Sequence, residues 1–173
     1  MSDVEPTRIL MLCTGNICRS PTAEVVLRVK AAAQGWGGRL VVDSAGIEAY
    51  HVGAPPDARS QEHAKRRGYD LGDLRARQVS SADFDRYDWL LAMDRWHLAA
   101  LKRRCPPGSA GWLRLFMSFG KGAPSEVPDP YYGDAAGFEL VLDLVESGCD
   151  ALLEWLQQTD SRGSGEPSEQ IHD

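Results

Sequence analysis

The stretch RILMLCTGNICRSPTAEVVLR, residues 8–28, is the part of the sequence that decides the fold. Its apolar run at 9–12 predicts a buried strand, and the spacing of apolar residues from Pro21 onward predicts an amphipathic helix over 21–34. A proline is tolerated in the first turn of a helix, and Ser20 before it is expected to cap that helix. A strand, a glycine-containing loop and a helix start in this order are typical of α/β proteins that bind anions through backbone N–H groups.

The loop between this strand and this helix carries a cysteine, Cys13, and an arginine, Arg19, with five residues between them. The helix start, the loop amides and the guanidinium would surround one point with positive potential, so a thiol there is expected to ionise near neutral pH. Taken singly, Cys13 could be a core cysteine and Arg19 a solvated surface arginine. Their combination with Gly15, Asn16 and Ser20 favours a phosphate site with a thiolate nucleophile.

The composition indicates an acidic globular protein. The chain has 173 residues, 43% of them hydrophobic, and a formal net charge of −6. These values suit one domain with a full core and argue against a general binder of nucleic acid or of anionic membranes. No apolar stretch approaches the roughly 18 residues of a membrane span, and no signal-peptide core precedes the first strand. We expect a cytoplasmic protein, with export by a signal-less route left open, that consists of a flexible start (1–7), one domain (8–158) and a disordered tail (159–173).

The rest of the chain alternates predicted strands with predicted helices. Such alternation gives a parallel sheet with helices on both faces, and ligands bind these sheets at the carboxyl ends of the strands. Cys13, Ser44 and Asp94 all fall at such ends, so we expect them at one edge of the sheet. The predicted strands after the first are 39–43, 87–94 and 112–116, and the predicted helices after the first are 57–67, 81–86, 96–104 and 138–158.

The string CTGNICRSP at 13–21 resembles the phosphate-binding loop of the low-molecular-weight protein tyrosine phosphatases, in particular of their bacterial members. Further similarity follows in the family's order, and together the motifs cover roughly residues 7–157: VDSAG at 42–46, GAPPDAR at 53–59, ARQ at 76–78, AMD at 92–94 and DPYYGD at 129–134. The resemblance implies a four-stranded parallel sheet of order 2-1-3-4, flanked by helices on both faces. This is the three-layer sandwich of the phosphotyrosine phosphatase I type.

Chemistry and the resemblance together give roles to the loop residues. Cys13 would attack phosphorus and form a phosphocysteine, while Arg19 would hold two equatorial oxygens with its planar fork. Ser20 would donate its hydroxyl to the Cys13 sulfur, and in the family Asn16 holds the loop through a network that includes Ser44. No metal is required, because the arginine and the amides supply the positive charge that a cation would otherwise supply. The remaining phosphate contacts would come from the backbone amides of Thr14, Gly15, Asn16, Ile17, Cys18 and Arg19.

The stretch DPYYGD would supply the general acid and one wall of the substrate cleft. By the resemblance, Asp129 protonates the leaving phenolate and then activates water on the phosphoenzyme. Tyr131 and Tyr132 would line the cleft, and Tyr50 would flank the substrate ring. A plain turn with stacked tyrosines is the alternative for this stretch. No histidine is predicted to act as a base, and Asp94 is expected to cap the next helix rather than to serve as the acid.

Two features of the loop region are left open by the sequence. Many relatives carry a histidine that helps to orient the loop asparagine, and here Leu74 stands in its place, so the partner of Asn16 is not identified. The family is known for a reversible disulfide between cysteines that match Cys13 and Cys18. Cys18 could equally fill a small apolar gap. Cys105 and Cys149 are far apart in sequence, and no paired spacing with histidines indicates a zinc site.

These observations predict hydrolysis of phosphotyrosine on proteins, with inorganic phosphate as the product, by a monomer without cofactor, nucleic-acid partner or membrane partner. Three alternatives stay open. Arginine phosphatases of this fold carry a threonine at the position of Ile17, whose apolar side chain here suits a phenyl ring. Arsenate reductases of this fold need two further neighbouring cysteines and lack the aspartate-proline acid. A silent phosphotyrosine-binding module could discard Cys13 and Asp129, both of which are present.

Overall fold

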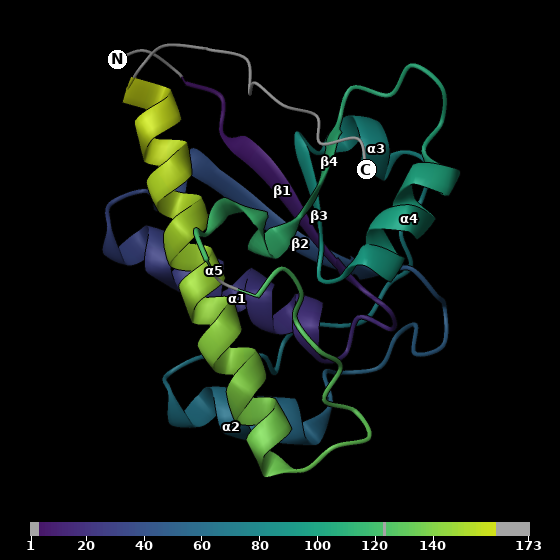
Figure 1. Ribbon diagram of the computed structural model, residues 1–173, viewed down its shortest axis with the longest axis vertical. Coiled ribbons are helices and arrows are strands. Elements are labelled where there is room, and N and C mark those ends of the chain that lie inside the picture. Colours follow the sequence, from purple (N-terminus) through teal and green to yellow (C-terminus); the bar gives the residue numbers. More distant parts are fainter. Residues whose placement is uncertain (1–3, 123, 162–173) are drawn as a thin grey trace.

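Four parallel strands form the centre of the fold (Figure 1). The computed structural model describes residues 4–122 and 124–161, so parts of the predicted flexible start and tail lie outside the described residues. The strands pair in the order β2-β1-β3-β4, which confirms the predicted order 2-1-3-4. Their bounds are β1 (Thr7–Cys13), β2 (Leu40–Gly46), β3 (Trp89–Ala92) and β4 (Trp112–Leu115).

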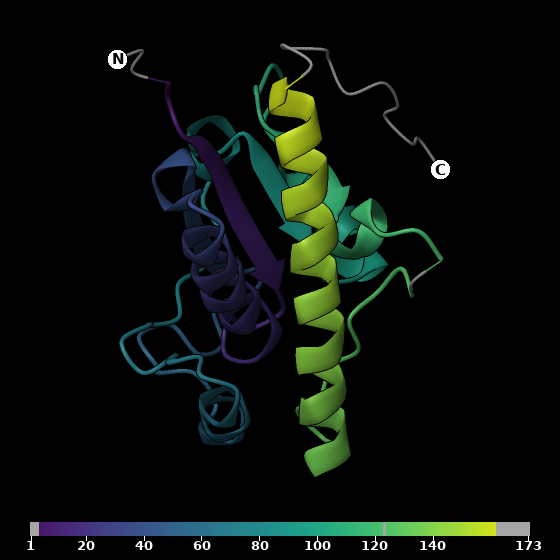
Figure 2. The ribbon, with the colours of Figure 1, turned by 90° about the vertical axis from the view of Figure 1, so that its left-hand side faces the viewer.

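Helices cover both faces of this sheet. Figure 1 shows α1 and α5 across one face, and α3 and α4 lie on the other. Figure 2 shows that α5 runs past the ends of the strands, where its N-terminal turns lie near α2. Within the described part of the chain, no helix is both long and apolar enough to cross a membrane. The helices are α1 (Arg19–Ala33), α2 (Ala58–Arg66), α3 (Asp83–Arg86), α4 (Arg95–Arg104) and α5 (Ala135–Ser161), with short 3-10 helices η1 (Gly37–Arg39) and η2 (Phe116–Phe119).

The apolar run in β1 explains the layered arrangement. Successive side chains of a strand point to opposite faces of the sheet. Ile9 and Met11 therefore pack into the cluster beneath α1 and α5, whereas Leu10 and Leu12 pack against residues of α3 and α4. All four side chains are fully buried, as a strand with both faces covered requires.

Most element boundaries differ from the sequence prediction by a few residues; β2, for example, runs to Gly46 rather than to residue 43. β3 is shorter than predicted and ends at Ala92, because Asp94 already turns the chain into α4. α5 begins at Ala135 and continues to Ser161, past the predicted end at 158. α1 begins at Arg19, so the predicted capping role of Ser20 is wrong. Ser20 lies inside the first turn, and the N-cap residue, Cys18, makes no side-chain capping bond among the described residues. The hydroxyl of Ser20 is engaged at the site instead.

Candidate active site

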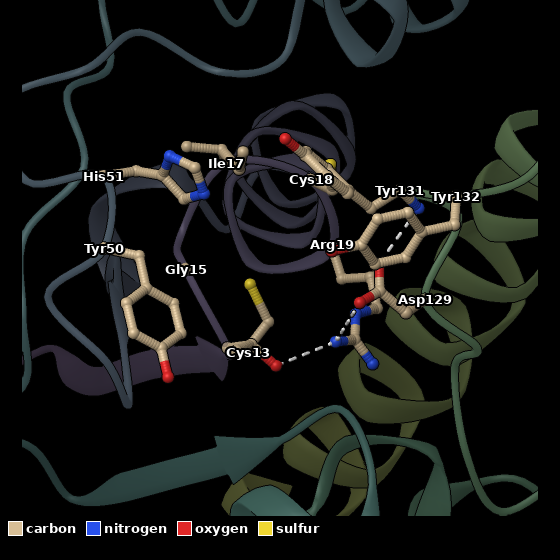
Figure 3. Close-up of a pocket in the computed structure, with 11 residues that line it drawn as sticks. Cys13, Gly15, Ile17, Cys18, Arg19, Tyr50, His51, Asp129, Tyr131 and Tyr132 are labelled. Carbon is tan, nitrogen blue, oxygen red and sulfur yellow. Dashed lines mark hydrogen bonds and ion pairs between the residues drawn. The ribbon is translucent and has the colours of Figure 1, made fainter.

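A pocket of about 330 Å³ opens at the carboxyl edge of the sheet, a volume that suits one small ligand group. Figure 3 shows the Cys13 sulfur pointing into its centre, with Tyr50 on one side and Arg19 and Asp129 on the other. The structure thus brings together the residues that the sequence singled out for phosphate binding and for the cleft. All of them line the pocket except Asn16, Ser20 and Ser44, which lie behind it.

Cys13 is the last residue of β1, and its side chain is held from below. It is only 2% exposed, and its Sγ lies 3.0 Å from Ser20 Oγ. Asn16 Nδ2 donates to the same Ser20 oxygen at 2.8 Å, so the Ser20 proton is free to point at the sulfur. The other acceptor for that proton, the Ala45 carbonyl, is more distant at 3.4 Å. The Ser20 hydroxyl is therefore placed to donate a hydrogen bond to the Cys13 sulfur.

Asn16 holds the middle of the loop. Its φ of 59° lies in the left-handed region, which asparagine tolerates better than most residues. The Nδ2 group donates to Ser20 and also, at 2.9 Å, to Ser44 Oγ. The backbone N–H of Arg77 donates to Asn16 Oδ1 at 3.1 Å. Three hydrogen bonds to one buried side chain therefore fix the shape of the loop.

Arg19 is 3% exposed, and three acceptors hold its guanidinium. Nη1 donates to Asp94 Oδ2 at 2.9 Å and to the Val127 carbonyl at 3.1 Å, while Nη2 donates to Thr14 Oγ1 at 3.3 Å. Asp94 Oδ1 accepts from the backbone N–H of His97 at 3.0 Å, which confirms that Asp94 caps α4. Both oxygens of Asp94 are thus occupied, and Asp94 is not free to act as the acid.

The loop that carries Asp129 is held more lightly. Its side chain is 48% exposed, and Oδ2 lies 3.6 Å from Arg19 Nη2. The backbone N–H of Tyr131 donates to Asp129 Oδ1 at 3.0 Å. Arg59 Nη2 donates to the Tyr131 carbonyl at 3.0 Å and is itself held by the carboxylate of Asp57. Asp129 therefore reaches the rim of the pocket beside the guanidinium while remaining open to water.

Comparison with known proteins bears on this arrangement of cysteine, arginine and aspartate. The family model for low molecular weight phosphotyrosine protein phosphatases matches residues 8–162. The chain belongs to this family. The resemblance found in the motifs is thereby confirmed.

Individual relatives agree with this assignment. The chain is 43% identical over 148 residues to a putative low molecular weight protein-tyrosine-phosphatase of Synechocystis, and the alignment covers 84% of this chain and 94% of that protein. The crystal structure of YfkJ from Bacillus subtilis matches with a TM-score of 0.84 at 35% identity, covering 91% of this chain and 98% of that chain. The crystal structure of a Drosophila arginine phosphatase matches with a TM-score of 0.81 at 28% identity, covering 86% and 97%.

At Leu74, where the family resemblance implies a histidine, the structure shows an apolar contact. Leu74 packs against the apolar cluster beneath α1 and α5. The backbone N–H of Arg77 supplies the donor to Asn16 that the sequence could not identify. Among the described residues, the loop asparagine is thus held by Ser20, Ser44 and the Arg77 backbone.

Glu24 extends the network and was not predicted. Its side chain is buried, Ser44 Oγ donates to its Oε1 at 2.7 Å, and Arg28 Nη2 donates to its Oε2 at 2.6 Å. Burial raises the pKa of the Glu24 carboxyl, although the bonds from Ser44 and Arg28 act in the opposite direction. A carboxylate accepts only, so it directs the Ser44 proton away from Asn16 and leaves the Ser44 oxygen free to accept. A spacing of four residues between Glu24 and Arg28 is also that of an ordinary helix-surface ion pair, so it does not indicate this network.

The second cysteine of the loop differs from the first. Cys18 packs in a small apolar cluster with Ile17, Ala76 and Phe138. Burial raises the pKa of the Cys18 thiol to about 12, so this sulfur stays protonated at neutral pH. Its surroundings are those of a gap-filling side chain. The disulfide with Cys13 stays a prediction.

The open walls of the pocket are aromatic. Tyr50 is 72% exposed and Tyr132 is 94% exposed, and the Tyr131 and Tyr132 rings meet edge to face at 4.9 Å between centroids. His51, to which the sequence gave no role, also lines the pocket. A Cβ at Gly15 would lie 2.7 Å from His51 Cδ2, so a larger residue there would force the His51 ring to move.

Proposed function

We propose that this protein hydrolyses phosphotyrosine on proteins through a phosphocysteine intermediate. The observation that carries the proposal is the arrangement of three side chains around one pocket. The Cys13 sulfur points into the centre, Arg19 lines the same space, and Asp129 Oδ2 lies 3.6 Å from Arg19 Nη2 (Figure 3). A nucleophile, a planar cation and a carboxyl group are the groups that transfer of a phosphoryl group from an ester needs.

In the first step, the Cys13 thiolate attacks phosphorus in line with the aryl oxygen. The S–P bond forms as the P–O bond to the aryl group breaks, and the Asp129 carboxyl gives its proton to the leaving oxygen. Arg19 holds two equatorial oxygens with its planar fork, and the backbone amides of 14–19 bind the others. The fixed position of the guanidinium means that little reorganisation is needed as charge develops.

In the second step, water attacks the phosphocysteine. The Asp129 carboxylate takes a proton from the water, a new P–O bond forms, and the S–P bond breaks with its electron pair returning to sulfur. The Ser20 hydroxyl, 3.0 Å from that sulfur, stabilises the thiolate as it leaves. The product is inorganic phosphate, and the loop returns to its starting state.

The walls of the pocket favour an aryl phosphate. Tyr50 and Tyr131 offer aromatic surfaces and Ile17 offers an apolar one, which suits the phenyl ring of phosphotyrosine better than a charged guanidino group. Protein arginine phosphatase activity is the second candidate, because the Drosophila arginine phosphatase has the same fold at 28% identity. We further propose a monomeric cytoplasmic enzyme that needs no cofactor, since Arg19 and the loop amides supply the positive charge.

The test is a parallel assay of peptides that carry phosphotyrosine, phosphoserine or phosphoarginine. We expect phosphate release from the phosphotyrosine peptide alone, and no release by the Cys13→Ser variant, which should still bind inorganic phosphate. Preferential release from phosphoarginine would transfer the assignment to the second candidate. Binding of phosphotyrosine without release of phosphate would leave only a binding module.

A further inference from the structure

His97 lies directly behind the phosphate-binding loop, although the sequence gave it no role. It sits in the first turn of α4 and is fully buried. Its Nε2 lies 2.8 Å from Thr14 Oγ1 and 3.5 Å from Arg19 Nη2, and its Nδ1 lies 3.1 Å from Asp94 Oδ1. One imidazole thus touches the residue after Cys13, the arginine of the loop and the carboxylate that fixes that arginine.

The surroundings of the ring determine where its proton lies. A guanidinium has donors only, so the Nε2 atom that faces Arg19 must present its lone pair. The proton therefore sits on Nδ1, on the side of the Asp94 carboxylate. Burial, together with the positive charge of Arg19, lowers the pKa of His97 to about 4, so the ring is neutral at the pH at which cells work.

This tautomer orients the Thr14 hydroxyl. Thr14 Oγ1 donates to His97 Nε2 at 2.8 Å and accepts from Arg19 Nη2 at 3.3 Å. We propose that His97 is a positioning residue. By orienting the Thr14 hydroxyl, it fixes the position of Arg19 Nη2 and of the start of the phosphate-binding loop. The inference concerns the same site as the proposed phosphatase function and rests on it.

A core histidine with no role at the site is the competing interpretation, and one feature speaks against it. His97 Nδ1 lies close to Asp94 but off the line of a hydrogen bond, so it is a buried polar atom without a hydrogen-bond partner among the described residues. Such an atom costs stability, and a leucine of similar size would avoid that cost. The other ring nitrogen, Nε2, accepts the hydrogen bond from Thr14 Oγ1, and this bond explains an imidazole at this position.

The test compares His97→Leu, Thr14→Val and the double variant with the wild-type protein. Each single change removes the bond between Thr14 and His97, and we expect each to lower kcat/KM for para-nitrophenyl phosphate roughly tenfold. Each should also weaken inorganic phosphate binding by a similar factor, measured by titration calorimetry. The double variant should be no worse than the poorer single variant, because both changes remove one interaction. His97→Gln, which can again accept from Thr14, should recover most of the loss.

Two controls separate this role from a loss of stability. His63→Leu removes another buried histidine, which bonds to Glu139 on α5, and should lower the melting temperature without changing phosphate affinity. Wild-type kinetics and phosphate affinity in His97→Leu and in Thr14→Val, or fully additive losses in the double variant, would overturn the proposal. The phosphate titration needs no turnover, so it tests His97 even if the proposed phosphatase activity fails.

Discussion

The phosphate-binding loop (13–19) and the loop that carries the proposed acid, Asp129 (the acid loop), border one pocket, but they differ in how far they are buried. In the first loop, Cys13, Asn16 and Arg19 are 2–3% exposed, and each has buried hydrogen-bond partners. In the second loop, Asp129 is 48% exposed at its side chain and Tyr132 is 94% exposed. The first loop is buried in the core, whereas the second is anchored at Val127 and leaves Asp129 and Tyr132 open to water.

The difference matches the chemistry that each loop would perform. Charge develops on the equatorial oxygens of phosphorus, so the groups that bind those oxygens work best when they are fixed before the reaction. A general acid that later acts as a base must meet first the leaving oxygen and then a water molecule. The partial exposure of Asp129 gives its carboxyl group access to both partners. Rigidity and access to water are thus divided between two segments of the chain.

The largest effect should come from a change in the buried phosphate-binding loop, which is the fixed side of the pocket. Arg19→Lys removes the planar fork and the paired contacts to Asp94 and Val127, so we expect kcat/KM for para-nitrophenyl phosphate to fall by roughly 10²–10³-fold. Inorganic phosphate should bind correspondingly more weakly. The measurement is steady-state kinetics together with phosphate inhibition. Near wild-type kinetics would show that the guanidinium is not the main anion-binding group.

A change on the exposed side should depend on the substrate. Asp129→Asn removes the proton donor, so hydrolysis of aryl phosphates with poor leaving groups should slow by roughly 10²-fold. Esters with good leaving groups need little protonation and should slow far less in the step that releases the phenol. The measurement is the pre-steady-state burst of released phenol for a series of substituted phenyl phosphates. Equal slowing across the series would point to a different acid.

The fixed side should also respond to acid. The pKa of His97 is about 4 in the folded protein, against about 6.5 in an unfolded chain. Between these values only the unfolded chain gains a proton, so stability is lost as the pH falls below 6.5. Urea unfolding at pH 7 and 4.5 should show that this loss is about 2 kcal/mol larger in the wild type than in His97→Leu. The same pH dependence in both proteins would contradict a neutral buried imidazole.

The smallest effect should come from loosening the acid loop. Arg59→Ala removes the bond to the Tyr131 carbonyl and the contact of the guanidinium with the Phe138 ring. We expect kcat to fall roughly threefold with phosphate affinity unchanged, because the phosphate-binding loop is not touched. Arg66→Ala is the matched control, since within the described part of the chain Arg66 pairs with exposed Glu62 on the same helix. Equal effects of both variants would remove Arg59 as an anchor.

The sequence predicted the fixed loop better than its supports. The strand, loop and helix at 8–28 follow from local spacing, and the motif placed Cys13 and Arg19 at the two ends of the loop. The strand order came from the family resemblance, because hydrophobic spacing does not determine which strands pair. Ser20 was misassigned as a cap, since the pattern cannot show that the helix begins two residues earlier than predicted, at Arg19.

The residues that support the loop were missed for different reasons. His97 meets Thr14 across 83 positions, and helical spacing does not say which face of α4 meets the loop. Glu24 lies close in sequence to the phosphate-binding loop. It was missed because its spacing from Arg28 is typical of an exposed ion pair. Arg59 contacts the loop of Asp129 by donating to the Tyr131 backbone carbonyl. Every residue has such a carbonyl, so the sequence does not indicate this contact.

The most direct test of the account is to trap the covalent intermediate. In Asp129→Asn, an aryl phosphate with a good leaving group should still phosphorylate the enzyme, while attack by water lacks its base. Rapid quenching followed by peptide mass spectrometry should then find one phosphoryl group on the peptide that contains Cys13, and specifically on that sulfur. A phosphoryl group on another side chain, or continued turnover with no phosphorylated protein, would contradict the account.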